Sequence, residues 1–241
     1  MRAGEPMKAL FFDFDGTLYI DGAISEDCRR ELLRVKDLGH RVILNTGRSY
    51  GFLPREARDE SLFDGMICGS SYVRFGGRVI ENLTLDRPTL KAAYNWGAER
   101  ALCVVFEGVE ENFSVNGQLR DASEIFAREK LPMITKVTMW CDPARVRGED
   151  LPLLRIVRFQ NYAEGIHPGR DKTSGMQTIL RHLGLDFNDA VAFGDSENDE
   201  EMLRAAGVGV CMASAPADFD RFCALRAKTK DGVPETLRIL F

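Results

Sequence analysis

The sequence has no long apolar run and no excess of positive charge. No stretch approaches the roughly 20 consecutive apolar residues that a membrane-spanning helix needs. The formal net charge is −5 and the sequence pI is about 5.4. Nucleic-acid-binding proteins, in contrast, normally carry a basic face. We therefore expect neither a membrane partner nor a nucleic-acid partner for this chain.

The sequence also lacks paired cysteines and metal-ligand patterns of histidine. Its six cysteines are scattered without any C-x-x-C spacing: Cys28, Cys68, Cys103, Cys141, Cys211 and Cys223. Isolated cysteines in a chain of this size are typical of small buried side chains in a reducing compartment. The three histidines, His40, His167 and His182, show no zinc-ligand spacing. We therefore expect a cytoplasmic protein without a zinc site.

The chain is long enough to form a substantial core. With 241 residues, 44% hydrophobic and 29% charged, it has the composition of a soluble globular protein of one or two domains. The first six residues are not followed by the hydrophobic region of a signal peptide. We expect residues 1–6 to be a dispensable tail, with Met7 as an alternative start.

The most informative features are two acidic motifs that each follow an apolar run. Asp13-Phe14-Asp15-Gly16-Thr17-Leu18 follows the run at 9–12, and Gly194-Asp195-Ser196-Glu197-Asn198-Asp199 follows the run at 190–193. In open α/β sheets, ligands bind beyond the carboxyl ends of the strands. Carboxylates gathered there repel one another unless a cation lies among them. Two unrelated strand-to-turn junctions are the alternative, but both motifs together are improbable by chance, so we predict a divalent-metal site for phosphoryl transfer.

The order of apolar runs predicts an α/β core. Strands are expected at 8–14, 41–45 and 65–68, with a helix from 26 to 38 that Ser25 caps and a helical stretch after residue 48. Such alternation favours a parallel, doubly wound sheet. The same rhythm resumes near the C-terminus, with a helix at 173–183, a strand at 190–193, a helix at 197–206, a strand at 208–212 and a helix after 232.

The pattern changes between these two parts of the chain. A β-hairpin with a Gly76-Gly77 turn is predicted for 72–80. From about 82 to about 168, the periodicity predicts helix, strand, strand, helix, strand and strand, with strands at 102–106, 113–116, 134–140 and 154–159. We therefore predict a discontinuous core of residues 1–81 and 169–241. Residues 82–168 are expected to form an inserted α+β module with an antiparallel sheet.

The first motif contains two residues suited to cleaving a phosphate ester. Asp13 and Asp15 are two positions apart, so on a continuing strand both would point to the same side. Gly16 and Thr17 then bend the chain and expose backbone N–H groups. A carboxylate can attack phosphorus when the phosphate charge is neutralised and the leaving oxygen is protonated. We assign Asp13 as the nucleophile, and Asp15 as general acid for the leaving group and then general base for water.

Carboxylates of both motifs are candidate ligands of a hard divalent cation. Mg²⁺ takes oxygen ligands and would offset the charge of a phosphate. The predicted ligands are the carboxylates of Asp13 and Asp195 and the backbone carbonyl of Asp15. Asp199 is expected either to bind the metal or to order its waters.

Two further segments offer groups for a phosphate. Thr46-Gly47-Arg48 follows a predicted strand and could present a hydroxyl and backbone N–H groups. The alternative is an ordinary strand-to-helix turn, and Arg48 could instead meet the inserted module or the substrate. Lys172 stands at the start of a predicted helix, where its ammonium would oppose the charge of the phosphate and the nucleophile. A solvated lysine is the alternative, and Arg170 is the residue most easily confused with it.

Taken in order, these segments resemble the four motifs of the haloacid dehalogenase-like phosphatases. The matching residues are Asp13-Phe14-Asp15-Gly16-Thr17, Thr46-Gly47-Arg48, Lys172, and Gly194-Asp195 with Asn198-Asp199. The long insert looks like the cap of the Cof-like branch. The resemblance implies a Rossmann-like core, Mg²⁺-dependent hydrolysis through an aspartyl-phosphate, and choice of substrate by the cap. It also implies a place for Asn198 near the substrate or the nucleophile, although this residue is equally typical of a helix start.

The chain departs from the Cof-like pattern on the expected substrate side. Gly69-Ser70-Ser71 stands where relatives often have Asn-Gly-Ala, and Ala213-Ser214-Ala215 where many have Gly-Asn-Ala. The insert is also short for that branch, which suggests a minimal cap. Its conspicuous side chains are expected to be core or solvated residues rather than substrate contacts: Trp96, Trp140, Glu107, Glu110, Glu111, Asn112, Arg155 and Arg158.

The expected function is a Mg²⁺-dependent phosphatase for a small phosphomonoester, such as a sugar phosphate or a phosphorylated cofactor. Asp15 favours this function over related ion pumps, which have Thr there, and over related dehalogenases, which lack the second Asp. A phosphomutase of the same superfamily is one alternative, although its cap must keep water from the intermediate. A non-catalytic protein that binds a phosphorylated metabolite is another, but binding alone does not require both Asp13 and Asp15. The sequence leaves the oligomeric state open.

Overall fold

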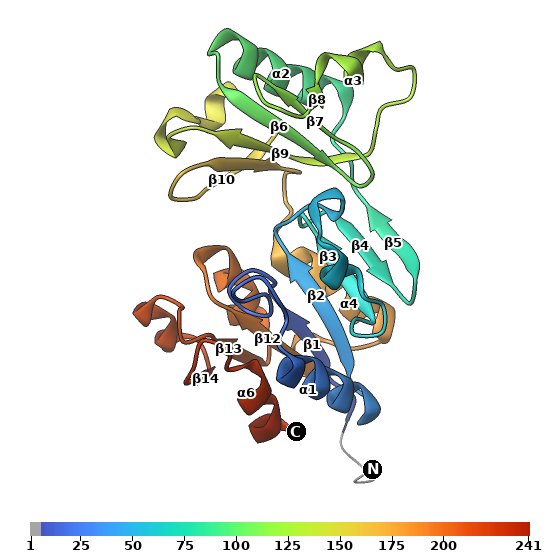
Figure 1. Cartoon of the computed structure of the whole chain (residues 1–241), viewed down its shortest axis with the longest axis vertical. Coiled ribbons are helices and arrows are strands. Elements are labelled where there is room, and N and C mark those ends of the chain that lie inside the picture. The colour runs from blue at the N-terminus through green and yellow to red at the C-terminus, as the bar shows by residue number, and fades with distance from the viewer. Residues whose placement is uncertain (1–5) are drawn as a thin grey trace. The chain divides into compact units, whose positions relative to one another are not determined.

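The structure is a computed structural model that describes residues 6–241. The prediction of a dispensable N-terminal tail therefore falls, except for Pro6, outside the described residues. The described chain divides into two compact units (Figure 1). The core unit comprises the described residues up to Gly47, Leu53–Ile80 and Asp171–Phe241. The insert unit comprises Arg48–Phe52 and Glu81–Arg170.

An eight-stranded sheet forms the centre of the core unit, in the order β14-β13-β12-β1-β2-β3-β4-β5. Its strands are β1 (Ala9–Phe12), β2 (Arg41–Thr46), β3 (Gly65–Cys68), β4 (Tyr72–Phe75), β5 (Arg78–Asn82), β12 (Ala190–Gly194), β13 (Val208–Cys211) and β14 (Leu225–Arg226). The strands from β14 to β3 are parallel, whereas β4 is antiparallel to β3. The hairpin of β4 and β5, predicted from the Gly76-Gly77 turn, forms one edge of the sheet.

Helices cover both faces of this sheet, as a doubly wound fold requires. They are α1 (Glu26–Asp37), α4 (Lys172–Leu183), α5 (Glu200–Ala205) and α6 (Val233–Leu240). Figure 1 shows α1 and α6 on one side of the sheet and α4 on the other. Alternate side chains of β1 point to opposite faces of the sheet. Those of Ala9 and Phe11 belong to the buried cluster that contains Met176 of α4 and Met202 of α5. The predicted α/β class with a Rossmann-like core is confirmed.

The helical stretch predicted after residue 48 is instead two 3₁₀ turns, Tyr50–Phe52 and Arg55–Arg58. Two further predicted elements differ in extent from those observed. The first strand ends at Phe12 rather than at residue 14, because the chain turns around the carbonyl of Phe14, which accepts from Leu18 N at 3.0 Å. The helix predicted for 197–206 begins with a 3₁₀ turn, Glu197–Asp199, and becomes α-helical at Glu200. Both differences fall at the acidic motifs, where polar side chains compete with the regular backbone pattern.

A six-stranded sheet forms the insert unit, in the order β10-β11-β9-β6-β7-β8. Its strands are β6 (Cys103–Gly108), β7 (Asn112–Val115), β8 (Arg120–Asp121), β9 (Ile134–Trp140), β10 (Arg155–Arg158) and β11 (Ala163–Ile166). Every pair is antiparallel except β7 with β8. Strands β8 and β11 are not predicted from the sequence, because β8 has only two residues and β11 contains Glu164 and Gly165, so neither is an apolar run.

Helices α2 (Arg87–Glu99) and α3 (Ser123–Ala127) cover one face of the insert sheet. Trp96 of α2 packs there with Phe106 and Phe113 in a hydrophobic core of this unit's own. Trp140, in contrast, is 53% exposed, and its ring lies 5.0 Å from that of Tyr162. Trp96 is therefore a core residue, whereas Trp140 is exposed.

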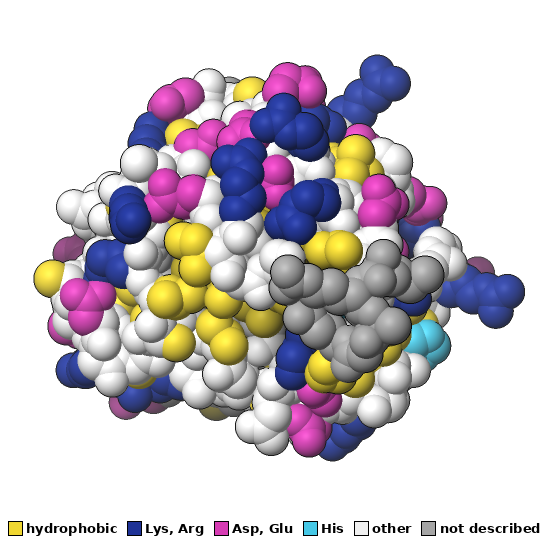
Figure 2. Space-filling model, turned by 90° about the horizontal axis from the view of Figure 1, so that it is seen from below, with side chains coloured by type: hydrophobic (Ala, Val, Ile, Leu, Met, Phe, Trp, Pro, Cys, Tyr) yellow, Lys and Arg dark blue, Asp and Glu magenta, His cyan; other side chains and the backbone are white. Residues whose placement is uncertain are grey.

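Among residues 6–241, no helix combines the length and the apolar character needed to cross a membrane. Charged side chains of both signs are interspersed over the face of the molecule seen in Figure 2. Such mixing leaves no large field of one sign on this face. The six cysteines are free thiols.

Candidate active site

The two acidic motifs meet where the order of the core sheet reverses. Strands β1 and β12 are parallel neighbours with Phe12 opposite Phe193, and Asp13 N donates to Phe193 O at 2.9 Å. The chain continues from β1 to β2 and β3 on one side, and from β12 to β13 and β14 on the other. Such a reversal leaves a crevice at the carboxyl ends of the strands, where ligands of open α/β sheets bind. Distant parts of the sequence thus bring their carboxylates to one edge.

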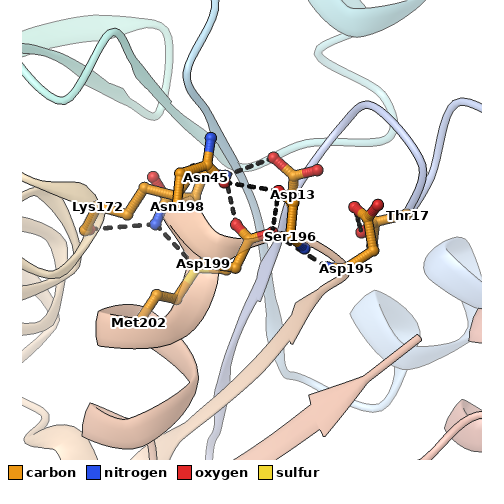
Figure 3. Close-up of polar contacts among 9 residues, drawn as sticks. All are labelled: Asp13, Thr17, Asn45, Lys172, Asp195, Ser196, Asn198, Asp199 and Met202. Atoms are coloured by element: carbon orange, nitrogen blue, oxygen red, sulfur yellow. Dashed lines mark hydrogen bonds and ion pairs between the residues drawn. The ribbon is translucent and has the colours of Figure 1, made fainter. Parts of the chain in front are cut away.

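Lys172 lies between two carboxylates at this edge (Figure 3). Its Nζ is 2.5 Å from Asp13 Oδ1 and 2.5 Å from Asp199 Oδ1. All three residues are buried. Burial lowers the pKa of Lys172, but the two carboxylates outweigh burial and hold this pKa above its usual value. The lysine therefore stays charged.

The position of Lys172 follows from the start of helix α4. Asp171 caps this helix by accepting from Ser174 N at 2.7 Å, and Lys172 is the first helical residue. Arg170, the residue most easily confused with Lys172, instead pairs with Glu81 at 2.5 Å within the insert unit. Of these two cations, only Lys172 contacts the acidic cluster in the described structure.

Asp195 completes a group of three carboxylates. One oxygen from each of Asp13, Asp195 and Asp199 lies within 4.8 Å of the others. The Thr17 hydroxyl donates to Asp195 Oδ1 at 3.1 Å. Gly16 allows the two motifs to approach, because its φ is +84° and a Cβ there would collide with the Asp195 carboxylate. Any other residue at position 16 would displace Asp195.

Asp199 is held more firmly than the other two acids. Its Oδ2 accepts from the backbone N–H groups of Asp195 and Ser196 at 3.0 and 3.1 Å, while its Oδ1 faces Lys172. Gly194 permits this arrangement, because a Cβ there would lie 2.5 Å from Asp199 Cβ. Both carboxylate oxygens thus have protein partners, and this geometry suits a residue that holds Lys172 and the 194–199 loop.

Three carboxylates face a single ammonium, so the cluster has an excess of negative charge. Burial, reinforced by the Asp199 carboxylate, raises the pKa of Asp13 above its ordinary value. Burial also raises the pKa of Asp195 to about 6, again with Asp199 as the next cause. A divalent cation would relieve both effects, because it brings positive charge to oxygen ligands. The donor set therefore fits a hard divalent metal between Asp13 and Asp195.

Part of the second motif lies at the same edge of the core sheet. Thr46 is the last residue of β2, the strand next to β1, and is 1% exposed. A Cβ on Gly47 would lie 3.5 Å from Asn198 Nδ2, so Gly47 and Asn198 are neighbours. Ser196 Oγ donates to Asn198 Oδ1 at 2.9 Å and fixes that amide. Thr46, Gly47 and Asn198 thus lie with the acidic cluster at the carboxyl ends of the strands.

Arg48 and Asp15 are not part of the three-carboxylate cluster. Arg48 begins the short segment of the insert unit, whose backbone approaches β6 so closely that a Cβ on Gly51 would lie 2.6 Å from Gly108 O. Asp15 is exposed, and strand alternation does not place it on the same side as Asp13, because β1 ends before Asp13. The Asp15 charge nevertheless contributes to raising the pKa of Asp195.

Three residues of this site make side-chain contacts that are not predicted from the sequence. Thr17 and Ser196 are described above, and both stand inside the acidic motifs, so their membership of those motifs could have identified them. The third is Asn45, whose Nδ2 donates to Lys172 O at 3.1 Å. The sequence pattern that could have identified Asn45 is weaker, because it is only a polar residue that follows Val42, Ile43 and Leu44 in a buried strand.

A doubly wound core with acids gathered at the sheet reversal is typical of an α/β enzyme. The chain also matches the family model of haloacid dehalogenase-like hydrolases over residues 10–138 and 150–236. It therefore belongs to the haloacid dehalogenase-like hydrolase family, and the resemblance to this family is confirmed.

Several proteins similar to this chain are named as phosphatases. The chain is 31% identical over 222 residues to a phosphoglycolate phosphatase of Methanoculleus marisnigri, covering 87% of this chain and 86% of the relative. It is 27% identical over 263 residues to the 5-amino-6-(5-phospho-D-ribitylamino)uracil phosphatase YitU of Bacillus subtilis, covering 95% and 96%. The solved structure of BT1666 from Bacteroides thetaiotaomicron has a TM-score of 0.85 at 23% identity, covering 99% and 97%, and shares the fold.

Proposed function

We propose that this protein is a Mg²⁺-dependent phosphatase that hydrolyses a small phosphomonoester through an aspartyl-phosphate. The observation that carries the proposal is the group of Asp13, Asp195 and Asp199 around Lys172 at the sheet reversal. Membership of the hydrolase family supports it, as do the phosphatase names of the relatives.

The proposed reaction has two steps on phosphorus. A carboxylate oxygen of Asp13 attacks phosphorus, the bond from phosphorus to the ester oxygen breaks, and Asp15 gives its proton to the leaving oxygen. Asp15 then takes a proton from water, whose oxygen attacks the phosphorus of the aspartyl-phosphate. The bond from Asp13 to phosphorus breaks, phosphate leaves, and both acids return to their starting states. The exposure of Asp15 supports this role, because the group must meet both an alcohol and water.

The remaining residues bind and orient in this proposal. Lys172 holds the Asp13 carboxylate and opposes the charge of the phosphoryl group. Thr46 and Gly47 offer a hydroxyl and backbone N–H groups, and Asn198 stands beside them. Arg48 is kept as a candidate contact to the substrate.

The proposed Mg²⁺ ligands are the Asp13 and Asp195 carboxylates and the backbone carbonyl of Asp15. Asp199 holds Lys172 and, when metal is present, orders its waters. The bound ion would neutralise charge on the phosphate.

We further propose that the predicted core, residues 1–81 and 169–241, performs the chemistry, and that the predicted cap, residues 82–168, selects the substrate. A separate sheet with its own hydrophobic core supports treating the insert as a module. A sugar phosphate or a phosphorylated cofactor is the proposed class of substrate. The six free thiols support the predicted cytoplasmic location.

Trapping the phosphoenzyme in Asp15→Ala tests this mechanism. With p-nitrophenyl phosphate the leaving group needs little protonation, so the first step continues while the second, which needs the base, is slow. We expect a burst of nitrophenol and, after acid quenching, one added phosphoryl group on the peptide that contains Asp13. Asp189→Asn, a change at a partly exposed ion pair with Lys8, is the matched control and should turn over without accumulating this species.

The metal requirement is tested separately by removing and restoring Mg²⁺. Hydrolysis should stop with a chelator and return when Mg²⁺ is added in excess. Phosphate release without any phosphoenzyme in Asp15→Ala would contradict the nucleophilic role of Asp13. Transfer of the phosphoryl group within the substrate, without free phosphate, would instead indicate a mutase.

A further inference from the structure

We propose that Asn45 is a positioning residue that sets the place of Lys172 through the backbone of helix α4. The proposal rests on the proposed function, in which Lys172 acts on Asp13 and the phosphate. Asn45 lies in β2 one residue before Thr46 and is completely buried. Figure 3 shows it beside Lys172 and Met202.

The Asn45 amide joins a strand to the first turn of a distant helix. Its Nδ2 donates to Lys172 O at 3.1 Å, although the two residues are 127 positions apart, and also lies 3.1 Å from Met202 Sδ. The cap by Asp171 stays within α4, since it bonds to Ser174. The bond from Asn45, in contrast, ties the helix start to the sheet whose edge carries Asp13.

The other half of the amide indicates why the residue is there. Asn45 Oδ1 is buried and has no hydrogen-bond partner among the described residues. An acceptor without a partner in a buried strand is unfavourable, and an apolar side chain like those of Val42, Ile43 and Leu44 would avoid this cost. A buried polar atom without a hydrogen-bond partner breaks the usual pairing of buried polar groups, and such exceptions are typical of residues kept for function.

Fixing the backbone of Lys172 matters because its side chain is long and flexible. The ammonium must reach Asp13 Oδ1 and Asp199 Oδ1 at 2.5 Å each, and a lysine stem alone permits many other positions. A displacement of about 1 Å in a catalytic group can cost about 10²-fold in rate. Anchoring the first helical residue therefore restricts where the ammonium can lie.

The test is Asn45→Leu, a change of similar volume that removes both the donor and the unpaired acceptor. We expect kcat/KM for p-nitrophenyl phosphate to fall about 10-fold while the melting temperature stays equal or rises. Asn82→Leu is a matched control, because Asn82 Nδ2 also lies 3.1 Å from a methionine sulfur, that of Met133, and its Oδ1 also has no partner among the described residues. That control should keep the activity of the wild type.

A double-mutant cycle separates positioning from general damage. In a Lys172→Met background, Asn45→Leu should change kcat/KM less than about twofold, because the group it positions is gone. Full activity in Asn45→Leu, or the same fractional loss with and without Lys172, would overturn the proposal. If Lys172→Met itself keeps full activity, the assigned role of Lys172 in the proposed function fails instead.

Discussion

Each of the two units buries one lysine against two carboxylates. In the core unit this is Lys172, already described. In the insert unit, Lys136 Nζ lies 2.5 Å from Glu164 Oε1 and 3.5 Å from Glu107 Oε2. For both lysines, burial alone would lower the pKa, but the neighbouring carboxylates raise it by more than burial lowers it. Each lysine therefore stays protonated.

The surroundings of the two lysines differ in a way that separates a site from a structural cluster. Lys136 and its partners come from the adjacent strands β9, β11 and β6, and the Thr138 hydroxyl donates to Glu107. Lys172 instead lies at the carboxyl ends of the core strands, among chain segments that are far apart in sequence. A third carboxylate, Asp195, lies beside its partners Asp13 and Asp199. A buried charge therefore points to chemistry when it lies at a strand end with acids in excess, and less so when it is inside a sheet.

Replacing the nucleophile should have the largest effect. Asp13→Asn removes the attacking oxygen charge, and we expect kcat to fall at least about 10³-fold. Circular dichroism should show the fold retained, because asparagine has nearly the same volume. Glu164→Gln, in the insert cluster, is the counterpart and should keep most of the activity towards p-nitrophenyl phosphate. Equal losses in the two variants would remove the distinction between the clusters.

Replacing each lysine tests the comparison directly. Lys172→Met and Lys136→Met each leave buried carboxylates without their cation, so each should lower the free energy of unfolding by about 3–5 kcal/mol. Only Lys172→Met should also lower kcat/KM, by about 10²–10³-fold, because only that ammonium faces the proposed nucleophile. Thermal unfolding and kinetics, both measured where the variants are folded, check this. An active Lys172→Met would contradict the comparison.

A smaller effect is expected from Gly16→Ala. The new Cβ would push the Asp195 carboxylate away, so the Mg²⁺ concentration needed for half-maximal activity should rise about 10-fold. Gly22→Ala is the matched control: its φ is +88°, close to the +84° of Gly16, but nothing lies within 4 Å of its Cβ. Both variants should lose about 1–2 kcal/mol of stability from the left-handed backbone. The same metal affinity in both would contradict the placement of Asp195.

The smallest effect expected is a pH-dependent stabilisation by Mg²⁺. Without metal, the pKa of Asp195 is raised to about 6. Between about pH 4 and about pH 6 the folded state therefore binds more protons than the unfolded state, so the contribution of this group to stability falls as the pH rises through that range. Mg²⁺ at about 100 times its dissociation constant should raise the melting temperature by about 5–10 °C at pH 8. The rise in melting temperature should be smaller at pH 5, where protons compete with Mg²⁺ for the Asp195 carboxylate. Asp195→Asn should remove most of the rise seen at pH 8. The same rise at both pH values would contradict this account.

The fold of the core was largely predictable because its strands are apolar runs with clear ends. Ser25 caps α1 as its sequence signals indicate, accepting from Cys28 N at 3.1 Å. Strand β14 was not predictable, because it has two residues, Leu225 and Arg226, and is specified by pairing with β13 rather than by its own pattern.

The acids of the site were predictable for a different reason. Asp13 and Asp195 stand at strand ends, and parallel strands bring such ends to one edge. The turn that exposes Asp15 and the bond from Asn45 to the backbone of Lys172 depend on long-range packing. No local spacing encodes contacts of that kind.

The place of β1 in the sheet has a consequence for how the chain is made. This strand lies between β2 and β12, yet β12 is formed by Ala190–Gly194, which is synthesised long after β1. Until that segment leaves the ribosome, one side of β1 presents backbone donors and acceptors that have no neighbouring strand. The insert strands, in contrast, all lie between Cys103 and Ile166 and can pair earlier. Chains truncated before residue 190 should therefore aggregate through the open side of β1.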